Sequence, residues 1–295
     1  MADMMNTREV AAYLRIKERK VYDLVKTGKI PCTRVTGKWL FPKTVIDLWV
    51  VQNLAQKGDP EVRQAPPPII AGSHDPLLDW AVRESNCGLA LMFGGSLDGL
   101  RRFADGQAIA CGLHVFDPPS GDHNLPTLYR TLAGRSVIAL TWAWRDQGLI
   151  VAKGNPKAIT GLPPLKSHQP RFVDRQQEAG SRLLFGHLLN EQDLSISDLN
   201  IIAAPALSET EVGLAVAEDR ADAGFGVAAV AQQLDLDFVP LTRERYDLVI
   251  GRHDFFDKPW QDLLWFTRSE RFSERAKQMG GYDVAETGCI VLNGA

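Results

Sequence analysis

The chain has few cysteines, and they are scattered along it. Cys32, Cys87, Cys111 and Cys289 stand alone, with no CxxC pair and no spacing that builds a metal site. Each has apolar neighbours, so we expect four buried free thiols. No apolar run is long enough to cross a bilayer, and the chain starts without a cleavable signal sequence. We therefore predict a reduced, cytoplasmic protein with no membrane contact, no metal and no cofactor.

Motifs that carry catalysis are also missing. The chain holds no Gly-x-Ser-x-Gly elbow, no phosphate-binding loop and no His-Glu-x-x-His. Pairs of Asp and Glu are plentiful, but the sequence does not place them in a site, so they are weak evidence for acid–base chemistry. We predict that the protein is not an enzyme.

Charge is divided unevenly along the chain. Residues 1–64 contain twelve Lys and Arg against seven Asp and Glu, whereas residues 65–295 contain 21 basic and 29 acidic residues. A basic head on an acidic body suits a protein that binds phosphates at one end only.

The pattern of residues 1–52 is that of a winged helix-turn-helix. Thr7 is a good N-cap for a first amphipathic helix, and a second one starts near Lys17. Gly28 ends the second helix, because glycine adopts the left-handed conformation easily. A short hairpin, the wing, follows, and Pro42 starts a third helix.

Five short segments of this head occur in the order found in a known group of domains. They are Thr7–Ala11, Val21–Tyr22, Gly28–Pro31, Gly37–Trp39 and Phe41–Pro42. The head thereby resembles the excisionase family of small DNA-binding domains, relatives of the MerR-type regulators.

The resemblance implies that the second helix enters the major groove of double-stranded DNA and that the wing reaches the backbone or the minor groove. Each candidate side chain could also be an ordinary solvated group. The expected contacts are Lys17, Arg19, Lys20, Tyr22, Arg34 and Lys38.

A polar stretch that ends in three prolines follows the head. Such composition favours an extended, semi-rigid spacer. We therefore predict a DNA-binding domain over residues 1–52, a linker over 53–68 and a larger domain over 69–295.

From Ile69 onward, short apolar runs alternate with helical patterns, which indicates α/β units. We predict strands at Val137–Trp142 and Gly148–Lys153, on either side of a turn that holds Arg145. An amphipathic helix is predicted at Glu270–Met279, near the end of the chain.

Many modest motifs of this region occur in the order typical of one superfamily. They are Gly72–Asp75, Gly95–Leu100, Gly112–His114, Arg145–Leu149, Gly154–Pro156, Arg175–Gln176, Gly180–Arg182, Ala221–Gly226 and Leu236–Leu241. The region resembles the two-lobed, type II periplasmic-binding-protein-like domains, above all those related to molybdate-binding proteins and fused behind helix-turn-helix modules. That resemblance implies two α/β lobes, crossover strands near 143–150 and 242–250, and a ligand held in the cleft.

Helix N-termini meet the ligand in this fold, and their free N–H groups and dipoles favour an anion. Gly95 and Ser96 open one helix, and Gly180 and Ser181 open another in the opposite lobe. Ser73, at the end of the first strand, is a third donor. Each serine could instead cap only its own helix.

Five further residues are candidates for the cleft. Arg145 and Arg175 could bind an oxyanion or a carboxylate, although Arg145 could equally pair with an acid across the lobes. His74 and His114 could line the cleft or serve the structure alone. Asp222 could accept a ligand donor or cap a loop.

Taken together, these features predict a ligand-responsive one-component transcription regulator that works as a homodimer or tetramer. Molybdate or tungstate is the leading ligand, with a larger organic solute as the other choice. Two other functions stay open. One is an enzyme on the same two-lobed fold with a DNA-binding head, and the other is an architectural, excisionase-like protein that bends DNA.

Overall fold

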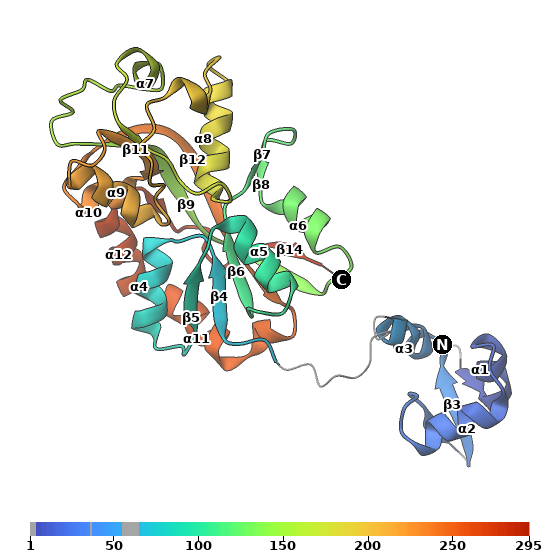
Figure 1. The fold of residues 1–295 in the computed structure, drawn as a ribbon. Helices are drawn as coiled ribbons and strands as arrows, with labels where there is room; N and C mark the ends of the chain where they lie inside the picture. Colours follow the sequence, from blue (N-terminus) through green and yellow to red (C-terminus); the bar gives the residue numbers. More distant parts are fainter. Residues whose placement is uncertain (1–3, 36, 55–64, 295) are drawn as a thin grey trace. The chain divides into compact units, whose positions relative to one another are not determined.

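The computed structural model describes residues 4–35, 37–54 and 65–294, which fall into two compact units divided between Gln64 and Ala65. Figure 1 traces both units. Most of the predicted linker, residues 55–64, lies outside the described part of the chain.

The small unit is built on a three-stranded antiparallel sheet of order β1-β3-β2. Val10, Val21, Phe41 and Ile46 have no exposed surface and join the helices to this sheet. Its elements are β1 (Met4–Asn6), α1 (Thr7–Tyr13), α2 (Glu18–Lys26), β2 (Thr33–Val35), β3 (Lys38–Pro42) and α3 (Lys43–Leu54). The winged helix-turn-helix predicted from the sequence is confirmed.

The start of α1 differs by one residue from the prediction. Asn6, not Thr7, is the N-cap, and its side chain accepts the backbone N–H groups of Arg8 and Glu9. Glu9 in turn accepts the N–H of Asn6, which completes a capping box. Asn6 also ends β1, a strand too short to show a sequence period.

The large unit contains a nine-stranded sheet with the main order β10-β11-β9-β12-β6-β4-β5. Its strands are β4 (Ile69–Gly72), β5 (Ala90–Phe93), β6 (Ala110–Leu113), β9 (Val137–Val151), β10 (Phe172–Val173), β11 (Ala223–Val227), β12 (Asp237–Gly251), β13 (Tyr282–Asp283) and β14 (Ile290–Asn293). A separate hairpin pairs β7 (Phe116–Asp117) with β8 (Asp122–His123).

Helices cover the sheet of the large unit. They are α4 (Pro76–Ser85), α5 (Ser96–Ala104), α6 (Leu125–Thr131), α7 (Pro163–Ser167), α8 (Gly180–Asn190), α9 (Glu209–Ala217), α10 (Ala228–Gln233), α11 (Lys258–Thr267) and α12 (Glu270–Met279), with short 3₁₀ turns η1 (Ile196–Asp198) and η2 (Asp254–Phe256). In lobe 1, which carries β4–β6, α5 packs on β4 and β6 (Figure 1). In lobe 2, which carries β10 and β11, α8 and α9 pack on β11.

Two long central strands join the lobes. β9 and β12 pair antiparallel along their whole length, so Arg145 lies inside a continuous strand and the turn predicted there is wrong. The physical reason is the pairing itself: β12 lies along one edge of β9, while β11, β13 and β14 share the other. Because both edges are hydrogen-bonded, polar residues in the middle of the strand do not interrupt it.

Membrane and cysteine features add two findings. Among the described residues, no helix has the length and apolar character needed to span a bilayer.

All four cysteines are free; Cys87 and Cys111 are buried and Cys32 is half-buried. Cys289 is exposed, contrary to the prediction, because it lies in the loop that leads into β14.

Candidate functional site

Three predicted residues meet at the carboxyl ends of neighbouring strands in lobe 1. Ser73 follows β4, Ser96 opens the helix after β5, and His114 follows β6. The Ser73 Oγ lies 3.0 Å from the Ser96 Oγ and 3.0 Å from the His114 Nε2. The backbone N–H of His114 donates a hydrogen bond to the Ser96 Oγ at 3.2 Å. These residues, at most 1% exposed, form what we call the serine–histidine cluster.

The N-terminus of α8 in lobe 2 lies directly against this cluster. A Cβ atom added to Gly180 would lie 2.4 Å from the carbonyl oxygen of His114 and 2.9 Å from the Ser96 Oγ. A Cβ on Gly95, whose φ is +105°, would lie 2.9 Å from the Glu178 carbonyl. The two glycines therefore let the lobes touch at two helix N-termini.

Neither of these helices has a side-chain cap. Gly95 and Ala179 are the N-cap residues of α5 and α8, and among the described residues no side chain accepts a hydrogen bond from the first N–H groups of either helix. Ser96 is engaged by its neighbours in lobe 1 instead of its own helix. The Ser181 Oγ is fully buried and has no hydrogen-bond partner among the described residues. Buried N–H groups that lack an acceptor at a helix N-terminus form an electropositive site.

Arg145 is held by two acids rather than left free in the cleft. Its guanidinium donates to Asp75 and to Glu244, and all three side chains are fully buried. The Arg145 Cζ also lies 4.6 Å from the ring centroid of Tyr246. Of the two roles that the sequence left open, the structure shows the ion pair.

Glu244, on β12, links this ion pair to the serine–histidine cluster. Its Oε2 lies 2.7 Å from the His114 Nδ1, and its Oε1 accepts a hydrogen bond from the Gln147 Nε2 at 2.6 Å. The sequence analysis missed Glu244. The signal was present as a run of charged residues, 243–245, in the middle of a strand that ends in the apolar run Leu248–Ile250.

Asp75 was also missed, although it lies in a quoted motif. Its Oδ1 accepts the Leu78 N–H and the Trp142 Nε1–H, and its Oδ2 accepts Arg145 and the Tyr282 hydroxyl. Asp75 is the N-cap of α4. It therefore anchors Arg145 to the start of a lobe 1 helix.

The remaining charged candidates are also paired. Arg175, 3% exposed on its side chain, forms an ion pair with the buried Glu209. Asp222 immediately precedes β11 and pairs with Arg171. The N-terminus of α9 lies at the other end of that strand, beside Gly226. The structure therefore does not bring Asp222 to the serine–histidine cluster: the start of β11 pairs with Val151, and only its carboxyl end reaches Gln147, which bonds to Glu244. His74 lies edge-on to Phe93, at a centroid distance of 4.8 Å.

Burial and charge set the ionisation of these groups. Burial opposes the charge on Glu244, but Arg145 and His114 outweigh it and hold the pKa of Glu244 well below its usual range. Burial lowers the pKa of His74 below its ordinary value, so His74 is neutral at neutral pH. Burial raises the pKa of Asp247 to about 6, against the opposing effect of Arg245.

The Glu244→Gln variant is expected to be less stable than wild type by about 3 kcal/mol at pH 7. This value is at the lower end of the destabilisation expected when a buried ion pair is broken, because Asp75 still balances the charge of Arg145. The folded pKa of Glu244 is depressed, so its stabilising contribution is complete above its unfolded pKa, near pH 4.3, and is lost as the pH falls below it. Urea unfolding at pH 7, 5, 4 and 3 should show the gap from wild type closing at acid pH. Glu274→Gln, exposed on α12, is the control. A gap that stays constant down to pH 3 would contradict this account.

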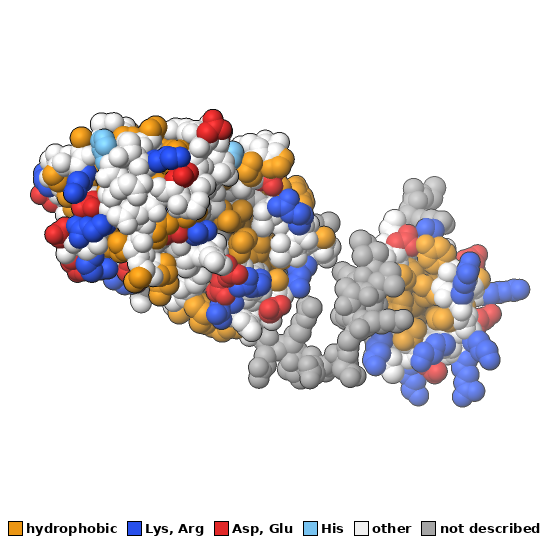
Figure 2. Space-filling model, turned by 45° about the horizontal axis from the view of Figure 1, so that its top comes forward, with side chains coloured by type: hydrophobic (Ala, Val, Ile, Leu, Met, Phe, Trp, Pro, Cys, Tyr) orange, Lys and Arg blue, Asp and Glu red, His pale blue; other side chains and the backbone are white. Residues whose placement is uncertain are grey.

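The candidate DNA contacts all lie on the surface of the small unit. Lys17, Arg19, Lys20 and Tyr22 are exposed on or just before α2, with Tyr22 51% exposed. On the wing, Arg34 and Lys38 are also exposed, and the Arg34 Cζ lies 5.4 Å from the Trp39 ring centroid. Figure 2 shows Lys and Arg side chains projecting from much of this unit, whereas acidic and basic side chains are mixed on the large one.

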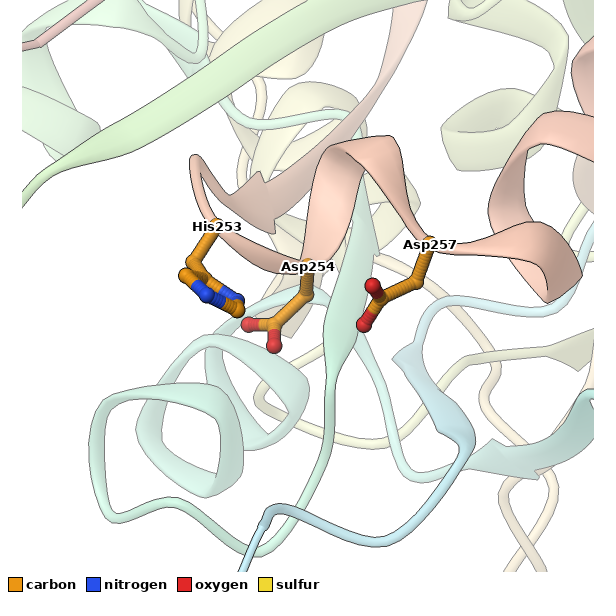
Figure 3. A group of neighbouring side chains, drawn as sticks. All are labelled: His253, Asp254 and Asp257. Atoms are coloured by element: carbon orange, nitrogen blue, oxygen red, sulfur yellow. The ribbon is translucent and has the colours of Figure 1, made fainter.

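One exposed group of side chains has the composition of a metal site. His253, Asp254 and Asp257, on and beside η2, bring their potential ligand atoms within 4.8 Å of one another (Figure 3). His253 and Asp257 are exposed, and the three residues come from one short turn. Exposed acidic groups of this kind are common without a metal, so we assign no ion to them.

Comparison with known protein families identifies both units. Residues 80–268 match the family model of the PBP superfamily domain, and residues 4–53 match that of a helix-turn-helix domain. The uncharacterized protein YvgK of Bacillus subtilis (strain 168) is 28% identical over 302 aligned positions, which cover 96% of each chain. An uncharacterized Clostridium pasteurianum protein, from the 5′ region of a ferredoxin 2Fe-2S gene, is 36% identical over 85 positions, or 28% of this chain and 75% of that one.

Two solved structures show the same fold as the large unit. One is PEB3 with bound L-phospholactate (TM-score 0.50, 16% identity), of which 98% aligns with 72% of this chain. The other is a putative phosphate ABC transporter substrate-binding protein from Clostridium perfringens with bound phosphate (TM-score 0.52, 12% identity), of which 96% aligns with 72% of this chain. Both units are of binding rather than catalytic types, one for DNA and one for a small solute. The chain belongs to the PBP superfamily and carries a helix-turn-helix domain ahead of its two-lobed domain.

Proposed function

We propose that the protein is a ligand-responsive transcription regulator in which the head binds operator DNA and the two lobes close on a small anion. Closure changes DNA affinity by as much as the ligand's affinity differs between the open and closed states. Because a single winged module buries little DNA surface, the regulator works as a dimer or tetramer.

The observation that carries the anion proposal is the meeting of two uncapped helix N-termini, those of α5 and α8, across the lobes. Their N–H groups and dipoles favour negative charge. The buried hydroxyls of Ser73, Ser96 and Ser181 add neutral donors. Since Arg145 and Arg175 are already paired with acids, the positive potential available to a ligand comes mainly from the helices.

A thermal-shift screen tests this proposal. Molybdate and tungstate are the first probes, as the sequence resemblance suggests, and sulfate is the comparator of the same shape and charge. Phosphate and small carboxylates complete the panel, since similar folds hold phosphate and L-phospholactate. A binding anion raises the melting temperature through RT ln(1 + [L]/Kd). An anion site requires that at least one of these classes of anion raises the melting temperature.

Ser96→Ala and Ser181→Ala are each expected to weaken the anion found in that screen by about 1–3 kcal/mol, because a buried hydrogen bond to a charged group is lost. Isothermal titration calorimetry measures the change. Ser273→Ala, on α12 in the large unit, is the control, since the Ser273 hydroxyl bonds, among the described residues, only to the Glu270 carbonyl of its own helix. Wild-type affinity in both cleft variants would show that these hydroxyls do not contact the ligand.

One arrangement favours a second function, a serine hydrolase. Ser73, His114 and Glu244 are hydrogen-bonded in the order serine, histidine, carboxylate, as in hydrolase triads. Against it, the Ser73 Oγ also bonds to Ser96, and Glu244 is shared with Arg145 and Gln147. A fluorophosphonate probe separates the two functions: a regulator stays unlabelled, whereas labelling lost in Ser73→Ala would make the protein an enzyme.

A further inference from the structure

Two hydrogen-bond acceptors are buried beside the crossover strands without a donor. They are the Gln147 Oε1 and the Glu209 Oε2, and neither has a partner among the described residues. Both residues have no exposed surface. A buried acceptor left unsatisfied is unfavourable, so a pair of them indicates that something else donates to them.

The orientation of the Gln147 amide is fixed by its neighbour. Its Nε2 donates to the Glu244 Oε1 at 2.6 Å, and Glu244 is a carboxylate already paired with Arg145. If the amide were turned over, two oxygen acceptors would face each other. The free atom of Gln147 is therefore the acceptor, not the donor.

The Glu209 carboxylate has one oxygen committed and one free. Arg175 donates to its Oε1, so the Oε2 is an acceptor on an ion-paired carboxylate. That Oε2 lies 3.3 Å from the position that a Cβ on Gly226 would occupy. The next residue, Val227, is paired in register with Gln147, so both acceptors lie at the carboxyl end of β11.

Gln147 and the serine–histidine cluster belong to one site, and Glu209 reaches its edge from the Gly226 face of β11, close enough to act electrostatically on Arg145 and His74. Glu244 contacts Gln147 through its Oε1 and the His114 Nδ1 through its Oε2. His114 in turn bonds to Ser73, and its carbonyl lies against Gly180 at the start of α8. The site thus offers donors, from helix N-termini and hydroxyls, and acceptors, from Gln147 and Glu209.

We propose that the ligand is a small anion that also carries a hydrogen-bond donor, such as a monoprotonated phosphate or a hydroxycarboxylate. This inference rests on the anion site of the proposed function. Sulfate, molybdate and tungstate carry no proton at neutral pH, so they would set oxygen lone pairs against both acceptors. A site built to accept a ligand's O–H rejects the analogue that lacks it.

Two matched pairs of probes test the inference by calorimetry on the full chain: phosphate against sulfate, and L-lactate against propionate. Within at least one pair, the member that carries an O–H is expected to bind about a hundredfold or more tighter. A preference in the first pair alone indicates an inorganic ligand, and one in the second pair alone indicates an organic ligand. If the two members of each pair bind equally tightly, or if the member without an O–H binds more tightly, the inference is wrong although the anion site stands. If none of the four binds, the inference is wrong, and the thermal-shift panel with molybdate and tungstate decides separately whether the anion site stands.

Glu209→Gln provides a second test. The amide keeps an oxygen for Arg175 and places an N–H where the free Oε2 lies, so the preference for the O–H member should fall at least about tenfold. Glu218→Gln makes the same charge change at an exposed position just after the same helix, where Glu218 pairs with Arg220, and should leave the preference unchanged. An unaltered preference in a folded Glu209→Gln variant would remove Glu209 from ligand recognition. Should that variant not fold, the wild-type probe pairs still decide the proposal.

Discussion

Replacing Arg19 and Lys20 with alanine is expected to abolish operator binding while leaving ligand binding intact. Both side chains are exposed on α2, and neither forms an ion pair with another described residue of the small unit. They are therefore free to contact bases or phosphates in the major groove. Each is expected to contribute about 1–3 kcal/mol, and each lost phosphate contact lowers the salt slope by about one unit.

The operator for this experiment is obtained by selecting a duplex from a random pool with the wild-type protein. Fluorescence anisotropy at several salt concentrations then gives the affinity and the salt slope. The control removes two positive charges from exposed positions of the large unit, Arg220→Ala with Lys258→Ala. Equal DNA affinity in the α2 double variant and wild type would remove this helix from the groove.

Gly180→Ala is expected to hold the two lobes apart and to weaken the ligand by about a hundredfold or more, because the ligand-competent closed state becomes rare. The added methyl would lie 2.4 Å from the His114 carbonyl oxygen, a backbone atom of the opposite lobe. Within α8 itself alanine is the better helix former, so lobe 2 should fold as before. The defect is thus confined to closure.

Gly186→Ala is a closely matched control for this variant. It makes the same substitution on the same helix, where the nearest atom, the Ile196 Cδ1, is 4.0 Å from the new Cβ. Small-angle scattering with and without ligand should show that Gly186→Ala compacts and Gly180→Ala does not. If Gly180→Ala compacts like wild type, the lobes do not close through this contact.

Local patterns predicted most elements of the fold. The helix expected at Glu270–Met279 has those bounds, because Ser269 caps it and an amphipathic pattern fills it. The helix starts at Ser96 and Gly180 were found from the Gly-Ser pairs at those positions, although neither helix has a side-chain cap. Local pattern failed at Arg145, where charged residues that read as a turn lie in a strand paired along both edges.

The residues that organise the candidate site were harder to predict than those that line it. Ser73, Ser96, Gly180 and Ser181 stand at strand ends or helix starts, which sequence reveals. Glu244 is separated from its partner His114 by 130 residues and from Arg145 by 99, so only the folded sheet brings them together. A buried acid in a strand has no periodic signature of its own, because its burial depends on a partner elsewhere in the chain.

The pairing of β14 with β9 has a consequence for the protein as it emerges from the ribosome. Residues 138–140 gain their second neighbouring strand from residues 290–293, which are synthesised after all of lobe 2. Lobe 1 is therefore assembled from the beginning and the end of the large unit, whereas the parts of lobe 2 between β9 and β12 form one uninterrupted stretch. Since domains generally fold as units in the order of synthesis, the head can fold first, lobe 2 next and lobe 1 last. A nascent chain would thus have a finished DNA-binding head before it has a finished sensor.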